Sequence, residues 1–340
     1  MAAAVLFGAG TPLAKLLLTQ ASPWLLAALL YMGSGLGLWL LRRFRRAPTA
    51  RLAHGEWPWL GGAVLSGGVI APVLLMTGLA AMPASSAALL LNAEGVFTAL
   101  LAWFAFKENF DRRIALGMFA IVAGAVVLSW PANSAVEFAS LWPALAVLGA
   151  CLGWAIDNNL TRKVALSDAS WIAMVKGLAA GATNLVLALS MGSAWPGAAA
   201  VLGAFVIGFL SYGASLTLFV IALRQLGTAR TGAYFSVAPF FGALMALALL
   251  DEPLTMSLLL GGALMAVGVV LHLTERHVHE HTHEAIEHDH EHTHGANDPH
   301  HDHEHIEPVM PGVHHTHRHR HAPVTHAHAH FPDAHHQHSH

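Results

Sequence analysis

The sequence predicts an all-α integral membrane protein with ten transmembrane helices, arranged as two inverted five-helix repeats and followed by a disordered tail. Three observations predict this fold class: an apolar composition, an uneven distribution of Lys and Arg between the connections, and an internal repeat. Hydrophobic residues make up 55% of the 340 residues and charged residues only 11%, whereas soluble domains carry about 25% charged residues. So little polar surface cannot cover a soluble fold, and we expect the lipid bilayer as the main solvent.

Apolar segments of roughly 17–25 residues are the units that cross a bilayer as helices. Ten of them lie near residues 1–19, 23–41, 57–79, 85–105, 114–130, 141–160, 169–190, 199–223, 229–250 and 255–274. Several are joined by very short connections, which indicates antiparallel neighbours. The chain opens on the first of these segments without the basic stretch of a cleavable signal, so we expect that segment to be a spanning helix.

Lys and Arg are confined to one set of connections. With the N-terminus in the cytoplasm, the odd-numbered connections hold neither residue. The even-numbered connections and the segment after the last span hold Arg42, Arg43, Arg45, Arg46, Arg51, Lys107, Arg112, Arg113, Arg162, Lys163, Arg224, Arg230 and Arg276. Cytoplasmic loops of membrane proteins are enriched in these residues. We therefore expect a multi-pass protein of the cytoplasmic (inner) membrane with both termini in the cytoplasm.

The third observation is a repeat. ASSAALLLNAEGVFTALLAWFAFKENFDRRIALGMFAIVAGAVV, from Ala84, aligns without a gap with TARTGAYFSVAPFFGALMALALLDEPLTMSLLLGGALMAVGVV, from Thr228. The shift of 144 residues aligns Glu108 with Glu252, Gly117 with Gly261, and Gly124 with Gly268. Each unit therefore holds five spans, and an odd number of spans inverts the second copy. We divide the chain into repeats at 1–135 and 136–275 and a cytoplasmic tail at 276–340; inverted repeats are typical of secondary transporters.

Two long segments, FTALLAWFAFKENFDRRIALGMFAIVAGAVVL and APFFGALMALALLDEPLTMSLLLGGALMAVGVVL, resemble the EamA branch of the drug/metabolite transporter superfamily. The openings LFGAGTPLAKLLL and LGWAIDNNLTRKVAL fit the first helix of each half, and the resemblance covers residues 1–275. It implies a gradient-driven transporter, in a family that handles amino acids, sugars, nucleotides, drugs and other metabolites. One departure is local: the second repeat has Pro239 where such helices often carry proline, but the first has Glu94 and Gly95 there.

Ionisable groups at bilayer depth cost about 2.5–3.5 kcal/mol on insertion scales, so each one calls for a partner or a function. We expect a transport cavity lined by Glu94, Asn92, Asp157, Asn158, Lys15, Lys176, Tyr212 and Tyr234. Glu94 and Asp157 are the candidates for binding a cation or relaying a proton, because a carboxylate can exchange its proton for a bound charge. The structural alternative is that Glu94 pairs with Lys176 or Lys15, or that it hydrogen-bonds to neighbouring helices.

After Arg276 the chain becomes a histidine-rich tail, which contains all 26 histidines except His54 and His272. In an extended chain His-x-His places two imidazoles on one face, and imidazole suits nickel, cobalt, zinc and copper. The expected ligands of such a divalent metal are His277, His279, His281, His283, His288, His290, His292, His294, His300, His301, His303 and His305. Prolines and the scarcity of apolar residues predict disorder without metal. The alternatives are pH sensing and a neutral low-complexity extension.

Several functions stay open from the sequence. One is a secondary exporter of a divalent transition metal with a metal-binding tail, and another is a metabolite or drug exporter whose tail is regulatory or incidental. A membrane-bound metal sensor or store is the third. No nucleotide-binding loop or catalytic arrangement is recognised, so we expect neither an enzyme nor a required cofactor. The expected partners are the lipid bilayer and a small solute or metal ion, with a homodimer as an alternative to the monomer and no nucleic acid.

Overall fold

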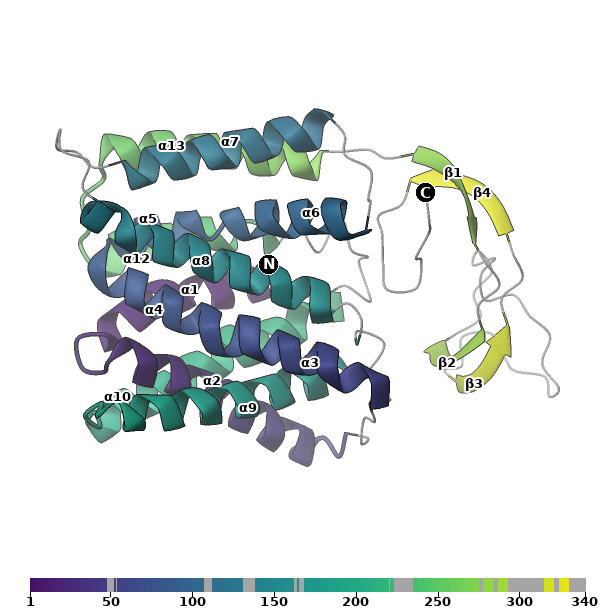
Figure 1. Cartoon of the computed structure of the whole chain (residues 1–340), viewed down its shortest axis with the longest axis horizontal. Coiled ribbons are helices and arrows are strands. Elements are labelled where there is room, and N and C mark those ends of the chain that lie inside the picture. The colour runs from purple at the N-terminus through teal and green to yellow at the C-terminus, as the bar shows by residue number, and fades with distance from the viewer. Residues whose placement is uncertain are drawn as a thin grey trace. The chain divides into compact units, whose positions relative to one another are not determined.

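A computed structural model divides the chain into two compact units, Met1–Glu275 and Arg276–His340. It describes residues 1–47, 52, 54–106, 112–130, 138–161, 164, 168–219, 221–222 and 235–274, and in the second unit 278–283, 287–292, 315–320 and 324–329. The first unit is a bundle of helices (Figure 1).

The first repeat contains α1 (Ala2–Leu17), α2 (Pro23–Phe44), a 3₁₀ turn η1 (His54–Glu56), α3 (Trp57–Ala63), a π-helix η2 (Val64–Ile70), α4 (Ala71–Ala81), α5 (Ala84–Leu90), α6 (Ala93–Phe106) and α7 (Arg112–Ser129). The second contains α8 (Phe138–Thr161), α9 (Ala169–Ser190), α10 (Ala198–Ile207), a π-helix η4 (Gly208–Ala214), α12 (Ala238–Leu249) and α13 (Met256–Leu273). Polar caps begin several of them: Ser22, Asp168 and Thr255 accept hydrogen bonds from the first backbone N–H groups of α2, α9 and α13.

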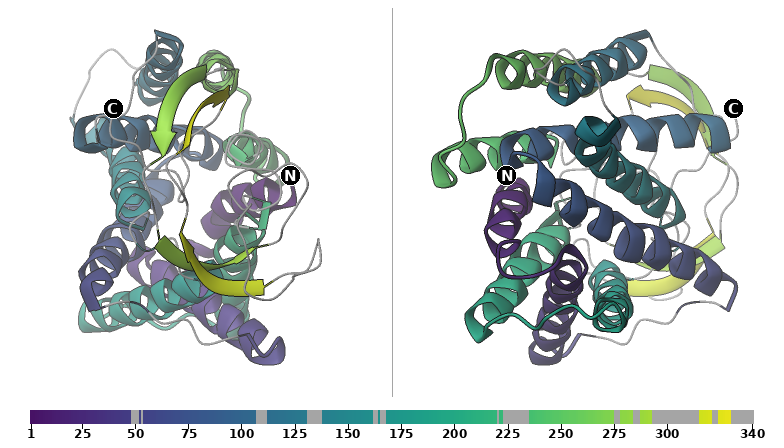
Figure 2. Two further views of the ribbon diagram at one scale, coloured as in Figure 1. Left: turned by 90° about the vertical axis from the view of Figure 1, so that its right-hand side faces the viewer. Right: turned by 60° about the vertical axis from the view of Figure 1, so that its left-hand side comes forward.

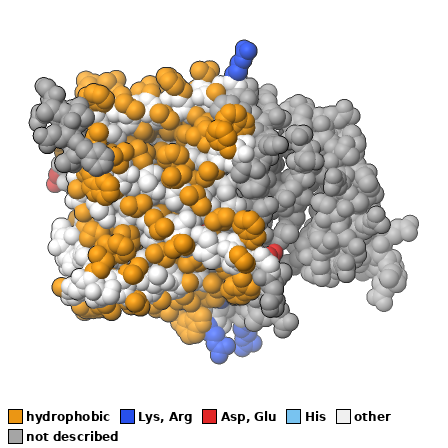
Figure 3. All heavy atoms as spheres, in the orientation of Figure 1, with side chains coloured by type: hydrophobic (Ala, Val, Ile, Leu, Met, Phe, Trp, Pro, Cys, Tyr) orange, Lys and Arg blue, Asp and Glu red, His pale blue; other side chains and the backbone are white. Residues whose placement is uncertain are grey.

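This unit has the composition and surface of an integral membrane protein. Seven helical segments of the described residues are long and apolar enough to cross a bilayer, and three shorter apolar helices accompany them. Hydrophobic side chains cover most of the face seen in Figure 3, and the Lys and Arg side chains in that view lie at its edges. The prediction of an all-α membrane fold is therefore confirmed for the first unit.

The inversion of the repeats is visible where α7 meets α13. A Cβ on Gly268 would lie 2.6 Å from Gly117 O, and a Cβ on Gly124 would lie 2.8 Å from Gly261 O. The sequence alignment pairs Gly117 with Gly261 and Gly124 with Gly268, so the contacts in space are crossed. A two-fold axis between the repeats requires this crossing, and it makes the two helices antiparallel (Figure 1; rotated views in Figure 2).

The second helices of the two repeats, α2 and α9, are also antiparallel. Ser22 Oγ at the start of α2 lies 2.8 Å from Ser193 Oγ, just after α9 ends. At the opposite ends, Arg42 Nη1 donates to Asp168 Oδ2 at 2.7 Å. Polar contacts thus fix both ends of this helix pair, with apolar packing between them.

A π-helix interrupts the third span of each repeat, which the sequence did not predict. The two π-helices begin at Val64 and Gly208, which are separated by the 144 residues of the repeat. At the end of each, a backbone N–H bonds to a carbonyl five residues back: Ala71 to Ser66 and Ser215 to Leu210. Such widened turns leave carbonyl groups available and occur often at functional sites.

A second departure is a break in the fourth span, which the sequence predicts as one helix over 85–105. The chain leaves the helical path at Leu91 and Asn92, between α5 and α6. Both the backbone N–H and the side-chain Nδ2 of Asn92 donate to Leu89 O, at 3.0 and 2.9 Å. An asparagine that bonds to nearby backbone in this way competes with the regular helix. In the second repeat, α12 begins at Ala238 after a turn at Ser236 and Val237.

In the second unit the structure has four short strands. They are β1 (Val278–His283), β2 (Glu287–His292), β3 (His315–Arg320) and β4 (Val324–Ala329). β1 pairs with β4 and β2 with β3, both antiparallel. The strands contain none of the tail's prolines, which cannot donate to a sheet. His277, His294, His300, His301, His303 and His305 lie outside the described residues.

Candidate functional site

The break between α5 and α6 places a carboxylate inside the bundle. Glu94 lies in the first turn of α6 and is half-buried. Its Oε1 accepts a hydrogen bond of 2.8 Å from Asn158 Nδ2 on α8. Within the described part of the chain, Glu94 forms no ion pair. Lys176 and Lys15 therefore do not pair with Glu94, and the hydrogen bond from α8 is the other structural alternative, a bond to a neighbouring helix.

Lys176 instead neutralises the other membrane carboxylate. Its Nζ, on α9, lies 2.5 and 2.7 Å from Asp157 Oδ1 and Oδ2. Thr161 Oγ1, one turn further along α8, donates to Asp157 Oδ1 at 2.8 Å. The side chains of Lys176 and Asp157 are only 15% and 9% exposed. The pair therefore joins α8 to α9 and leaves neither charge free to hold a solute.

The π-helix η2 fixes α8 and α2 beside this pair. Gly67 O accepts hydrogen bonds from Tyr31 Oη at 2.8 Å and from Trp154 Nε1 at 2.9 Å. Asn184 Nδ2 on α9 donates to the next carbonyl, that of Gly68, at 3.1 Å. Three neighbouring helices thus bond to carbonyls of one widened turn. A side chain at Gly67 would overlap the Asp157 carboxylate, so glycine is required for this approach.

Tyr31 also reaches the π-helix of the other repeat. Its ring lies 5.6 Å from the ring of Tyr212 in η4, and Phe7 meets Tyr212 edge to face at 6.0 Å. The two symmetry-related π-helices are therefore linked through a single tyrosine. Sequence analysis included Tyr212 but missed Tyr31 and Trp154. Both are aromatic residues with a hydrogen-bonding group inside an apolar span. That feature, together with the Gly67–Gly68 pair in another span, was the available signal in the sequence.

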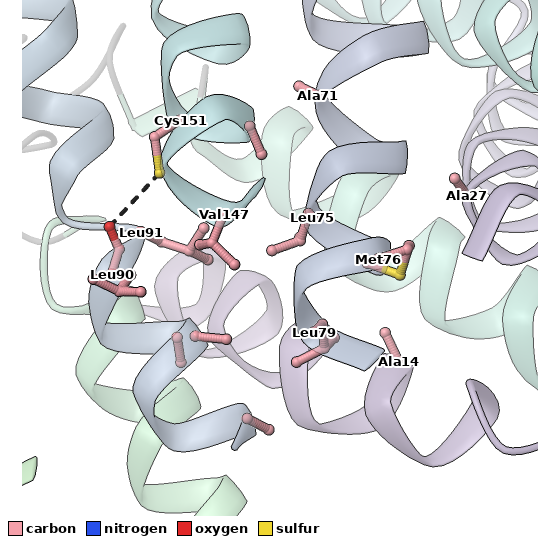
Figure 4. Packing of buried hydrophobic residues seen from close by; sticks show 14 of the residues in the cluster. Ala14, Ala27, Ala71, Leu75, Met76, Leu79, Leu90, Leu91, Val147 and Cys151 are labelled. Atoms are coloured by element: carbon pink, nitrogen blue, oxygen red, sulfur yellow. Dashed lines mark hydrogen bonds between the residues drawn. The ribbon is translucent and has the colours of Figure 1, made fainter. Parts of the chain in front are cut away.

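One face of α8 follows the fourth span across its break. Cys151 Sγ donates to the carbonyl oxygen of Leu90, the last residue of α5, at a distance of 3.6 Å (Figure 4). Asn158, two turns further along α8, donates to Glu94 at the start of α6. Cys151 is fully buried among apolar side chains such as Val147. The same face of α8 therefore contacts both sides of the break.

Asn92 and Lys15, which were also predicted as site residues, lie apart from this group. Asn92 is buried, and its Nδ2 bonds to Leu89 O and lies 3.9 Å from Met265 Sδ of α13. It shapes the break but does not contact Glu94 in the described contacts. Tyr234 lies outside the described residues.

Lys15 holds the end of α4. Its Nζ donates to the carbonyls of Leu79, Ala80 and Met82 at 2.6, 3.2 and 3.0 Å. A cation at a helix C-terminus satisfies carbonyl groups that have no partner within the helix. Lys15 is thus used in the packing of α1 against α4.

Glu252 holds the start of the next helix in the same manner. Its two carboxylate oxygens accept from the N–H groups of Ala84 and Ser85, at 2.6 and 2.9 Å, at the N-terminus of α5. The turn between α4 and α5 therefore lies between a cation from the first repeat and an anion from the second.

The chemistry of the group around Glu94 is that of an oxygen-lined site. The unpaired carboxylate can bind a cation or a proton, and Asn158 can orient it. No group of three or more His, Cys, Asp or Glu suited to hold a metal ion occurs among the described residues. The described residues thus provide one carboxylate and one amide at this site.

Comparison with known proteins yields consistent matches. The model of the EamA-like transporter family matches residues 1–130 and 141–274. An uncharacterized transporter of Methanothermobacter thermautotrophicus is 28% identical over 289 residues, which cover 79% of this chain and 83% of that protein. A solved crystal structure with 20% sequence identity superposes with a TM-score of 0.60 over 79% of this chain and 92% of that chain, which shows a similar fold.

Proposed function

Because this chain belongs to the EamA-like transporter family, we propose that it is a secondary transporter that exports a small solute through a site at Glu94 and Asn158. The observation that carries the proposal is the Glu94 carboxylate: it lies at a break within a spanning segment, and its partner among the described residues is an amide donor and not a cation. Discontinuous helices near the midplane are where secondary transporters bind their solutes. An ionisable residue at this depth is a functional candidate for the same reason.

The proposed orientation has both termini in the cytoplasm and the protein in the cytoplasmic membrane. The distribution of Lys and Arg supports it, because every Lys and Arg of the connections falls on one side. Export is the proposed direction because a cytoplasmic tail could bind the solute, or sense its concentration, on the side from which the solute leaves.

The test is a comparison of the small-solute and metal content of cells by mass spectrometry. Cells express the wild-type protein, Glu94→Gln or Asp251→Asn. Asp251 is an exposed carboxylate with φ 49°, a conformation that asparagine tolerates, so the control makes the same chemical change outside the site. The expected result is a solute whose level falls with wild type and Asp251→Asn but not with Glu94→Gln. Equal profiles for wild type and Glu94→Gln would contradict the proposed site.

A second candidate function, export of a divalent transition metal, is favoured by the histidine register of the tail. Histidines stand opposite each other across both strand pairs: His279 with His328, His281 with His326, His288 with His319, His290 with His317, and His292 with His315. Positions i and i+2 of a strand share a face, so each pair of strands can offer several imidazoles to one ion. The paired histidines between residues 315 and 328 are not among the metal ligands expected from the sequence.

The same mass-spectrometry experiment separates this candidate when cells are challenged with nickel, cobalt, zinc or copper. A protein that ends at Arg276 is added to the comparison. Metal export predicts a lower cellular level of one metal with wild type and not with Glu94→Gln. If metal levels follow only the presence of the tail, the tail sequesters metal and the metal-export function is rejected.

A further inference from the structure

The break in the fourth span holds more hydrogen-bond acceptors than donors. Leu90 O receives only the long thiol contact from Cys151 in the described part of the bundle, and a thiol is a weak donor. Neither Glu94 Oε2 nor Asn158 Oδ1 has a hydrogen bond among the described residues. All three oxygens belong to the break or to the α8 residue that contacts it. Glu94 is half-buried and Asn158 is exposed, so a ligand can reach their oxygens, and a carboxylate beside further acceptors favours a cation over an anion.

Among the described residues, the two lysines of the spans are already engaged. Lys176 is bound to Asp157 through both carboxylate oxygens. Lys15 is bound to three backbone carbonyls at the end of α4. The Asp157–Lys176 pair is neutral as a unit, so the ionised Glu94 gives this group of residues a net charge of −1 when the site is empty.

The charge of the ligand follows from this balance. A proton on Glu94 makes the group neutral, and so does one monovalent cation beside the carboxylate. A divalent metal would leave a net positive charge within the membrane, which is costly, and the described residues provide no third ligand of the kind it needs. Proton and monovalent cation are therefore the two occupants that the site can hold at similar cost.

We propose that Glu94 and Asn158 form an exchange site for one proton or one monovalent cation, so that each cycle trades the two across the membrane without net charge movement. This inference rests on the proposed function and defines the charge class of its solute or coupling ion. The cation is an alkali ion or the ammonium group of a small organic solute. When it arrives, the Glu94 carboxyl releases its proton to water on that side, and the carboxylate pairs with the cation.

Carbodiimide labelling of the full-length protein in detergent tests the exchange. The reagent adds to a protonated carboxyl in an apolar site, and mass spectrometry of the peptides locates the adduct. Labelling of Glu94 is measured at several pH values with added sodium, trimethylammonium, tetramethylammonium, magnesium or nickel chloride at equal ionic strength. These amines cannot form an amide with the activated carboxyl. Asp157 is the internal control, because its ion pair should protect it throughout.

The expected result is labelling at Glu94 that a monovalent cation suppresses at least tenfold more effectively than either divalent ion, and that acid restores. Suppression by sodium identifies an alkali site, whereas suppression by the methylammonium ions alone identifies an organic cation. Suppression by nickel or magnesium alone, or none by any ion, overturns the inference. If transport requires Glu94 but only nickel protects it, the proposed site survives and the charge class fails. If Glu94→Gln transports normally, the proposed site itself fails.

Discussion

Lys176 Nζ lies 2.5 and 2.7 Å from the two carboxylate oxygens of Asp157, and this pairing leaves Glu94 without a cationic partner in the part of the chain that the structure describes. Asp157 and Asn158 are consecutive on α8, so one residue of this helix meets α9 while the next meets α6. The two carboxylates of the spans therefore have different partners: Asp157 pairs with an ammonium group on α9, and Glu94 accepts from an amide on α8.

The Asp157–Lys176 pair should behave as a unit in stability measurements. Asp157→Asn alone leaves a buried ammonium without its counterion and should lower the free energy of unfolding by about 3 kcal/mol. Adding Lys176→Met should restore much of this loss, because both charges are then removed. Unfolding in mixed detergent micelles measures all three proteins. A double variant less stable than Asp157→Asn would contradict the explanation that the unpaired Lys176 charge causes the loss of stability.

Close packing of α2 on α9 should depend on Gly35. A Cβ at this position would lie 2.6 Å from Leu178 N, which is backbone and cannot move aside alone. Gly35→Ala should therefore lower the free energy of unfolding by about 1–3 kcal/mol.

Gly61 in α3 is the matched control, since a Cβ there meets nothing within 4 Å. Gly61→Ala should be neutral or stabilising by up to about 1 kcal/mol, as expected for alanine in an exposed helix. The same unfolding assay applies, and equal effects at both glycines would refute the close-packing explanation.

Substitution of either Glu252 or Lys15 should destabilise the turn between α4 and α5. Glu252→Ala removes two charge-assisted hydrogen bonds to the start of α5 and should cost about 1–3 kcal/mol of unfolding free energy. Lys15→Met should cost a similar amount at the end of α4. Hydrogen exchange of the Ala84 and Ser85 amides is the local readout. Unchanged exchange in Glu252→Ala would mean that the carboxylate does not hold these groups.

Acid should destabilise the junction of α2 and α9 through Asp168, which lies outside the spanning segment. Burial alone would raise the pKa of Asp168, but hydrogen bonds from Arg42, Ser170 and the Trp171 N–H outweigh it and hold the pKa below its usual value. A lowered folded-state pKa contributes stability that is complete above the unfolded value of about 3.9 and is lost as the pH falls through the folded one. Melting curves at falling pH should show this loss in wild type and a smaller loss in Asp168→Asn. Parallel pH profiles for the two proteins would rule out the contribution.

Metal binding by the tail should depend on which histidines are removed and not only on how many. Three of them, His315, His317 and His319, stand opposite β2 histidines. Replacing all three with Gln should weaken nickel binding to the full-length protein about tenfold, because paired strands lose shared ligands. The control replaces His335, His336 and His338, which lie outside the described residues. Titration calorimetry that gives equal losses for both triples would indicate independent histidines.

Much of the fold could be predicted because its causes are spread over many residues. Apolar length, the segregation of Lys and Arg, and the 144-residue repeat all indicate the same inverted bundle. The crossed contacts of Gly117 with Gly268 and of Gly124 with Gly261 follow from that symmetry once the repeat is recognised. By contrast, the π-helices leave no periodic signal, since one extra residue per turn disturbs only a short stretch of an apolar segment.

The sequence indicates which residues of the candidate site are polar, but it does not indicate how they pair. Glu94, Asp157 and Asn158 stand out as polar residues in apolar spans, and the structure brings Glu94 to Asn158. Which carboxylate takes Lys176 depends on how α9 is rotated against α8, and the sequence contains no direct record of that rotation. Tyr31 and Trp154 were missed because their partner is a backbone carbonyl, Gly67 O, that a regular α-helix would not offer.

The most direct test of the central claim is proton release from inside-out membrane vesicles with an imposed pH gradient, acid inside. Sodium or tetramethylammonium is added outside, and an internal pH-sensitive dye follows the gradient in vesicles with wild type, Glu94→Gln, Glu94→Asp or Asp251→Asn. The account predicts that an added monovalent cation dissipates the gradient with wild type and Asp251→Asn, more slowly with Glu94→Asp, and not with Glu94→Gln, whether or not a membrane potential is clamped. Dissipation by Glu94→Gln at the wild-type rate would contradict it.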